Sequence, residues 1–271
     1  MHCAGPLRRD LAERALNYAQ ANSLPYSLSY GETPVVCFAP NGPLHGNFIP
    51  ASFKAITANP AWRKRLAKVH AQGRRSLPTT DRGRWMELDT CTSSDALLMN
   101  IFCHPATPLR LWPLLGVATD VIPEFGYKAR VPLINGRFDR TEVDLSLGNL
   151  LIEAKLTESD FQRANKHVLA TYRDFHNVFD EEQLPQTEQH YLSYQLLRNV
   201  LAAHALECSF CVLLDARRPD LIEDWYAIMK CVKLAQLRTA LRVLTWQDLA
   251  QFLSPQLQLF LAKKYGIEPA T

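Results

Sequence analysis

The sequence lacks several signals that mark common protein classes. No apolar run approaches the length needed to cross a bilayer, which argues against a membrane-spanning protein. Neither a Gly-rich phosphate-binding loop nor a Gly-x-Ser-x-Gly nucleophile segment is present. ATP-driven, redox and serine-hydrolase activities are therefore disfavoured. A chain of 271 residues with 47% hydrophobic residues can nevertheless bury a substantial core.

The chain also lacks the signs of an exported protein. Its seven cysteines are scattered without regular spacing, as expected for reduced thiols in the cytosol. Cys208 and Cys211 lie in an apolar run that predicts a buried strand, where alternation points their sulfurs to opposite faces. Residues 1–10 contain no apolar segment of the kind that a secretory signal needs. We therefore expect a cytoplasmic protein without a zinc or disulfide site.

Positive charge is concentrated in one segment, although the formal net charge of +3 is small. Residues 62–84 contain eight basic side chains and a single acid, Asp81. Such a segment can neutralise phosphates along a nucleic-acid backbone, or it can form the solvated face of a helix followed by a loop. The candidate nucleic-acid contacts in this segment are Arg63, Lys64, Lys68, Arg74 and Arg75.

The hydrophobic periodicity predicts an α/β fold in which most strands lie in the second half of the chain. Helical spacing and capping residues predict helices at 7–22, 61–70, 93–102, 159–177, 188–205, 221–236 and 245–261. Short alternating or apolar runs predict strands at 35–38, 125–133, 138–147, 150–156, 208–214 and 242–244. We expect one compact core over residues 93–271, preceded by a helical and irregular elaboration over residues 1–92.

Two adjacent strand candidates form a predicted hairpin that gathers polar side chains on one face. Gly148-Asn149 separates two runs that both alternate polar and apolar residues, which is the signal of a two-residue turn. If the turn closes in this way, Asp144 lies opposite Glu153, and Lys155 projects from the same face as Glu153. The other face is entirely apolar and carries Val143, Leu145, Leu147, Leu150, Ile152, Ala154 and Leu156.

The polar face of this hairpin has the chemistry of a metal site. Two carboxylates side by side repel one another unless a cation lies between them, and their oxygen atoms suit Mg²⁺ or Mn²⁺. A lysine beside them can polarise a water molecule or stabilise charge on a phosphate. Asp144, Glu153 and Lys155 therefore supply the parts for metal-assisted hydrolysis. The alternative is an exposed hairpin face on which the acids simply pair with Lys155.

The same residues resemble a known motif. Val-Asp at 143–144, followed after the hairpin by Ile-Glu-Ala-Lys at 152–155, is similar to the PD-(D/E)xK motif of the restriction-endonuclease-like superfamily, although the first proline of the motif is missing. The resemblance implies an α/β core with a central mixed β-sheet flanked by helices, over roughly residues 93–244. Segments elsewhere look similar to a subgroup of bacterial restriction endonucleases, at 93–96, 141–144, 194–199 and 215–220.

This resemblance also implies a function. The chain is expected to be an endonuclease that hydrolyses DNA with Mg²⁺, for which Mn²⁺ can substitute, in restriction or phage defence. Asp144 and Glu153 would bind the metal and Lys155 would assist the attacking water. A homodimer is expected where both strands are cut. The alternatives are a nucleic-acid-binding protein of the same fold without turnover, and a nuclease acting on RNA or branched DNA.

Members of the superfamily often add an acid from the preceding helix and a polar group from the following one. Glu87 is the candidate third metal ligand, with Asp120 and Glu124 as competitors. Gln195 is the candidate polar group in catalysis. On its predicted helix it shares a face with Arg198, a candidate nucleic-acid contact, and this face can equally be turned to solvent.

Overall fold

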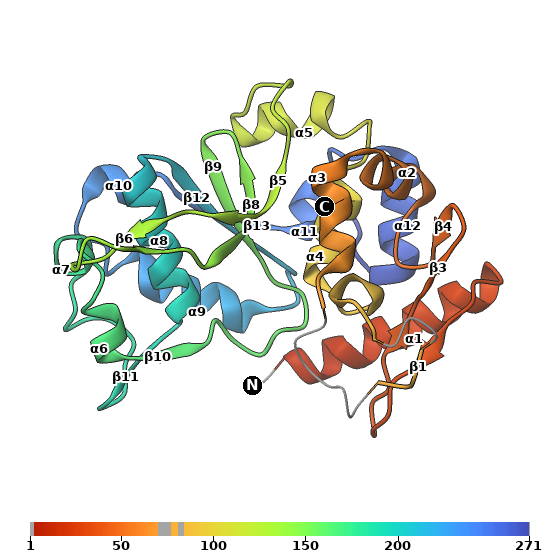
Figure 1. Cartoon of the computed structure of the whole chain (residues 1–271), viewed down its shortest axis with the longest axis horizontal. Helices are drawn as coiled ribbons and strands as arrows, with labels where there is room; N and C mark the ends of the chain where they lie inside the picture. Colours follow the sequence, from red (N-terminus) through yellow and green to blue (C-terminus); the bar gives the residue numbers. More distant parts are fainter. Residues whose placement is uncertain (1–2, 70–76, 81–83, 271) are drawn as a thin grey trace. The chain divides into compact units, whose positions relative to one another are not determined.

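The computed structural model describes residues 3–69, 77–80 and 84–270, and they form two compact units (Figure 1). The first unit consists mainly of residues 121–245, and the second consists of residues 4–120 together with residues 246–271. This division differs from the expected boundary after residue 92. No helix in the described part of the chain is long and apolar enough to span a membrane.

The first unit is built on a mixed five-stranded sheet, as expected for the α/β class. Its strands lie in the order β13, β12, β9, β8 and β5. Strand β12 runs parallel to its neighbours β9 and β13, whereas β8 runs antiparallel to its neighbours β9 and β5. The bounds of these strands are β5 (Glu124–Lys128), β8 (Glu142–Leu147), β9 (Leu150–Ala154), β12 (Ser209–Leu214) and β13 (Leu241–Thr245).

The β8–β9 hairpin has the predicted register. Leu147 pairs with Leu150, and the ladder continues to the pair of Leu145 with Ile152. Gly148 closes the turn with a φ of 59°, a left-handed conformation that glycine adopts without a steric penalty. Every residue of β9 is buried, because β9 lies between β8 and β12 rather than at an edge.

Helices pack against this sheet, and their apolar side chains form a hydrophobic core together with those of the strands. In Figure 1, α8 and α9 lie beside β12, and both contact it. Apolar side chains of α8 such as Leu196 and Val200 belong to one buried cluster with Leu151 and Val212 of the sheet. The helices of this unit are α6 (Lys166–Leu169), α7 (Phe175–Val178), α8 (Tyr194–Leu206), α9 (Pro219–Met229) and α10 (Ala235–Thr239).

The helix predicted over residues 159–177 is wrong. The chain there forms strand β10 (Arg163–Asn165) followed by the short helices α6 and α7. Gln162 has a φ of 62°, which interrupts a helical backbone, and β10 pairs with β11 (His190–Leu192) from much later in the sequence. Asn165 then caps α6 by accepting a hydrogen bond from the backbone N–H of His167 at 3.2 Å.

The second unit is mostly helical and is closed by contacts between distant segments. Helices α1 (Ala4–Ala21) and α12 (Pro255–Tyr265) pack together. The side-chain nitrogen of Lys264 in α12 is buried and donates to the carbonyl of Gly46 at 3.1 Å and to Asn47 Oδ1 at 2.5 Å. These contacts explain why residues 246–271 belong to this unit and not to the sheet-containing unit.

Helix α4 (Ser94–Phe102) also belongs to the second unit, although we expected it in the core of the first. Asn100 is fully buried, donates to the carbonyl of Asn47 at 2.9 Å and accepts from the backbone N–H of Ile49 at 2.9 Å. The remaining elements of this unit are β1 (Ser27–Leu28), β2 (Val36–Cys37), β3 (Pro40–Asn41), β4 (Leu44–His45), α2 (Pro50–Ala58), α3 (Pro60–Arg63), η1 (Lys64–Ala67), η2 (Glu87–Asp89), α5 (Pro108–Leu115) and α11 (Trp246–Ala250).

Candidate active site

The β8–β9 hairpin brings the three predicted catalytic residues together. Lys155 Nζ donates a hydrogen bond to Glu153 Oε1 at 2.9 Å. Asp144 is half-buried, and its Oδ2 accepts a hydrogen bond from the backbone N–H of Ala154 at 2.8 Å. Glu153 and Lys155 are only 2% and 5% exposed. The ion pair therefore exists, but it does not lie on the exposed hairpin face that the alternative interpretation required.

Helix α8 covers the pair with two polar side chains one turn apart. Gln195 Oε1 accepts a hydrogen bond from Lys155 Nζ at 2.9 Å. Asn199 Nδ2 donates to Glu153 Oε2 at 2.8 Å, and its side chain is fully buried. Because residues four apart lie on one face of a helix, a single helix holds both partners of the ion pair. Gln195 was an expected site residue, whereas Asn199 was not.

Arg198 holds the side chain of Asn199 in place. Its Nη2 donates to Asn199 Oδ1 at 2.9 Å and to the carbonyl of Glu142 at 2.8 Å. This contact orients the amide of Asn199, with the oxygen toward Arg198 and the N–H group toward Glu153. Arg198 is 4% exposed, so the expected role as a nucleic-acid contact does not fit its position. The structure gives it a supporting role instead.

The carboxylates around Lys155 favour the protonated form of its side chain. Burial by itself would lower the pKa of this ammonium group, but nearby carboxylates outweigh burial and hold its pKa above the ordinary range. These carboxylates belong to Glu153, Glu158 and Asp144. A lysine with a raised pKa is a poor proton acceptor. Lys155 is therefore suited to stabilising negative charge rather than to acting as a general base.

Arg218 fixes the loop that follows β9. It is fully buried, and its guanidinium donates to the carbonyls of Glu158 at 2.6 Å and Ser159 at 3.2 Å. The same group makes a paired contact with the Asp220 carboxylate at 2.9 and 2.8 Å. Within this loop, Glu158 Oε2 accepts from the backbone N–H of Leu156 at 2.7 Å. Arg218 thus holds the backbone of Glu158, whose charge acts on Lys155.

Replacing Arg218 by methionine is expected to destabilise the protein by about 2–3 kcal/mol, since two carbonyls lose their donor while the apolar volume is largely kept. Urea unfolding followed by circular dichroism measures this loss. Arg173→Met is the matched control, because the Arg173 side chain is 60% exposed and forms an ion pair with the adjacent Asp174. Equal unfolding midpoints for the two variants would contradict the structural role of Arg218.

The predicted third metal ligand, Glu87, lies in the second unit within an ion-pair network. Its carboxylate accepts a hydrogen bond from Lys68 Nζ at 3.0 Å. Lys68 also contacts Asp95 Oδ2 at 3.0 Å, and Arg65 contacts the same oxygen at 2.6 Å. Burial and then the charge of Asp95 raise the pKa of Glu87, although Lys68 acts in the opposite direction. A role for Glu87 as a metal ligand stays a prediction.

The predicted basic segment divides into three groups. Arg63 and Lys64 are exposed, as a nucleic-acid contact requires. Lys68 is instead engaged with the carboxylates of the second unit. Arg74 and Arg75 lie outside the described residues.

Asp144 and Glu153 are carboxylates of the kind that Mg²⁺ takes as ligands, and no third acid stands with them in a recognised metal-binding group of the described residues. No group of three or more His, Cys, Asp or Glu residues that could hold a metal occurs in the described ranges. Magnesium in enzymes commonly uses one or two carboxylates and completes its shell with water and substrate phosphates. A carboxylate oxygen has two acceptor positions, so the hydrogen bonds from Lys155 and Asn199 leave each Glu153 oxygen a further position.

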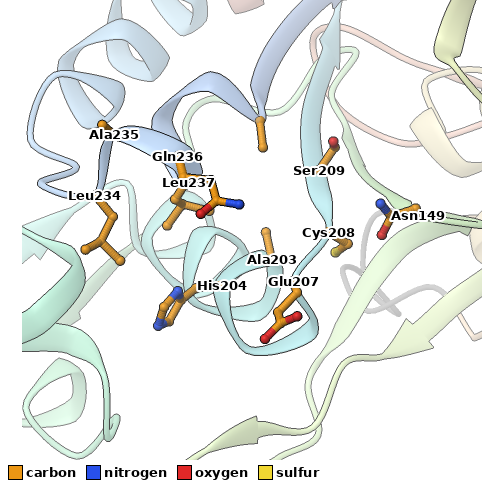
Figure 2. Close-up of a pocket in the computed structure, with 11 residues that line it drawn as sticks. Asn149, Ala203, His204, Glu207, Cys208, Ser209, Leu234, Ala235, Gln236 and Leu237 are labelled. Carbon is orange, nitrogen blue, oxygen red and sulfur yellow. The ribbon is translucent and has the colours of Figure 1, made fainter.

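A separate pocket of about 600 Å³ lies at the other end of α8. Figure 2 shows His204 and Glu207 from the end of this helix, Asn149 from the hairpin turn and Gln236 from α10 around it. None of the predicted catalytic residues lines this pocket. The candidate site is therefore the hydrogen-bonded cluster around Glu153 and Lys155, not this pocket.

Comparison with known proteins identifies a family for the chain. The family model described as Restriction Endonuclease associating with ARP matches residues 13–266, a range that contains every residue of the cluster. No curated protein and no solved structure gives a significant match. The matched range covers nearly the whole chain, and the mixed sheet flanked by helices is consistent with a restriction-endonuclease-like fold. The chain therefore belongs to the family of restriction endonucleases associating with ARP.

Proposed function

We propose that the protein is a Mg²⁺-dependent endonuclease that hydrolyses phosphodiester bonds of DNA. The observation that carries this proposal is the buried contact between Glu153 and Lys155 beside Asp144. Membership of a restriction-endonuclease family supports the same chemistry. A protein that only binds nucleic acid has no need for these acids, since carboxylates near a polyanion repel it unless a cation is present.

Each residue of the cluster has a distinct part in the proposed reaction. Asp144 and Glu153 would hold Mg²⁺, which when bound supplies a Lewis acid and an activated water. Lys155 keeps its positive charge and offsets the negative charge that develops on the phosphoryl group. Gln195 and Asn199 hold Lys155 and Glu153 in place through hydrogen bonds. Burial of the pair lowers the local dielectric and strengthens these interactions.

Metal-dependent cleavage of DNA tests the proposal. Purified protein is incubated with supercoiled and linear plasmid in the presence of Mg²⁺, Mn²⁺ or EDTA. We expect cutting with either metal, no cutting with EDTA and no cutting by Asp144→Asn, because that variant loses a metal-binding charge. Glu182→Gln, which alters an exposed acid of the same unit, should cut normally. Binding of DNA without cleavage under any metal would overturn the proposal, and parallel RNA substrates would then identify the other nuclease class.

A further inference from the structure

A small hairpin beside the main sheet turns one face to the core and the other to solvent. It consists of β6 (Val131–Pro132) and β7 (Phe138–Asp139), and Val131 pairs with Asp139 while Pro132 pairs with Phe138. The backbone N–H of Leu133 donates to the carbonyl of Arg137 at 2.9 Å, which continues the same register. We call residues 130–140 the β6–β7 hairpin.

The inner face of the β6–β7 hairpin is anchored in the core. Val131 is buried and Leu133 packs against the same apolar cluster as α8. By strand alternation, the outer face carries the neighbours of these residues: Arg130, Ile134, Phe138 and Arg140. Ile134 and Phe138 are large apolar side chains of this face and are 66% and 42% exposed. The Arg130 guanidinium lies 4.8 Å from the centre of the Phe138 ring, so both belong to one surface.

The charge of this surface is positive and is not balanced within the hairpin. Arg130 and Arg140 of the outer face are exposed, and so is Arg137, which pairs with Leu133 and by alternation lies on the other face. Among the described residues, none of these three guanidinium groups forms an ion pair. The only acid in the hairpin is Asp139, and its oxygens accept hydrogen bonds from Tyr172 and Thr141. Exposed arginines beside an exposed ring are the groups that bind phosphates and stack on bases.

Hydrogen bonds connect the hairpin to the helix that holds the candidate active site. Asp139 Oδ2 accepts from the hydroxyl of Tyr172 at 2.6 Å, and the Tyr172 and Tyr194 hydroxyls are 2.9 Å apart. Tyr194 is the first residue of α8 and immediately precedes Gln195, which contacts Lys155. The hairpin is therefore fixed with respect to the cluster, as a surface that presents a substrate must be.

We propose that the outer face of the β6–β7 hairpin binds a DNA strand and holds it for the cluster at Asp144, Glu153 and Lys155. The arginines would contact phosphates, and Phe138 would pack on a sugar or an unpaired base. This inference rests on the proposed nuclease function. It assigns substrate binding to the sheet-containing unit, in addition to any contribution from the basic segment at residues 62–84.

Binding without cleavage tests this surface. The affinity of the protein for fluorescein-labelled duplex and single-stranded DNA is measured by fluorescence anisotropy in EDTA over a series of salt concentrations. For the double variant Arg130→Gln/Arg140→Gln, we expect about tenfold weaker binding or more, and a slope of log K against log salt that is smaller by about 2. For Phe138→Ala, binding of the single strand should weaken by about tenfold.

Arg238→Gln is the matched control, since Arg238 is an exposed arginine of α10 in the same unit. Circular dichroism checks that every variant is folded, which these exposed positions should allow. If the double variant binds with the affinity and salt slope of Arg238→Gln, or if the wild type does not bind DNA, the inference is overturned. If the wild type cleaves DNA but the double variant binds DNA as tightly as the wild type, the hairpin surface is rejected and the nuclease function stands. If the hairpin variants weaken DNA binding but the wild type does not cleave DNA, the nuclease function is rejected and the binding surface stands.

Discussion

Replacing Lys155 by methionine is expected to lower the rate of DNA cleavage by about a thousandfold, the cost of removing one preorganised electrostatic contact from a buried site. The ammonium lies 2.9 Å from both Glu153 Oε1 and Gln195 Oε1, so its position is fixed before substrate arrives. Single-turnover cleavage of a labelled duplex with Mg²⁺ measures the chemical step. Lys155→Gln should show a similar loss. Because glutamine is polar but uncharged, this result would attribute the loss to the missing charge.

Lys230→Met is the control for this measurement, because Lys230 is an exposed lysine at the end of α9. It should cleave at the rate of the wild type. If a folded Lys155→Met variant cleaved DNA at a nearly normal rate, Lys155 would have no part in the reaction and would serve only in a structural ion pair with Glu153.

The hairpin that carries the site could be predicted from the sequence because its signals are local. Gly148 and Asn149 define the turn, and alternation on each side defines which residues share a face. The burial of Glu153 and Lys155 could not be predicted in this way. It arises because β12 and α8, which come much later in the chain, pair with β9 and pack over it.

The sequence pattern indicates the face of the helix on which Asn199 lies, but not its place in the site. It lies four residues after Gln195, so the helical periodicity places both on one polar face. Nothing in the sequence indicates that this face is buried against β9 and not turned to solvent. The start of α8 was similarly displaced: a helix was expected from residue 188, but residues 190–192 form β11 because they pair with β10.

The division into units depends on contacts that span most of the chain. The side-chain nitrogen of Lys264 donates to Asn47, and Asn100 also contacts Asn47, so this residue of the second unit is held by partners from two distant helices. Local patterns give the helices but not their partners. For that reason α1 and α4 lie near their predicted places, whereas the single helix predicted over residues 245–261 is divided into α11 and α12. The predicted domain boundary at residue 93 also differs from the division into units.

Replacing Asn199 by leucine is expected to reduce both stability and cleavage. The substitution keeps the volume but removes the donor to Glu153 Oε2 and the acceptor for Arg198, leaving two buried charged groups each short of a partner. We expect a loss of about 3 kcal/mol in the free energy of unfolding and a drop of about 10–100-fold in cleavage. Urea unfolding and single-turnover cleavage at several Mg²⁺ concentrations measure the two effects. Asn177→Leu, at an exposed position of α7, is the control for an Asn-to-Leu change.

Asn199→Asp should separate the two effects. An aspartate at this position can still accept the hydrogen bonds of Arg198, and this ion pair offsets the repulsion from Glu153, so the variant should lose less stability than Asn199→Leu. It has no N–H group for Glu153 and adds a negative charge beside that carboxylate, so cleavage should fall at least as far as in the leucine variant. If cleavage instead follows stability across both variants, Asn199 serves only to hold the fold. If the aspartate variant stays folded but cleaves poorly, the orientation of Glu153 by Asn199 is part of the catalytic arrangement.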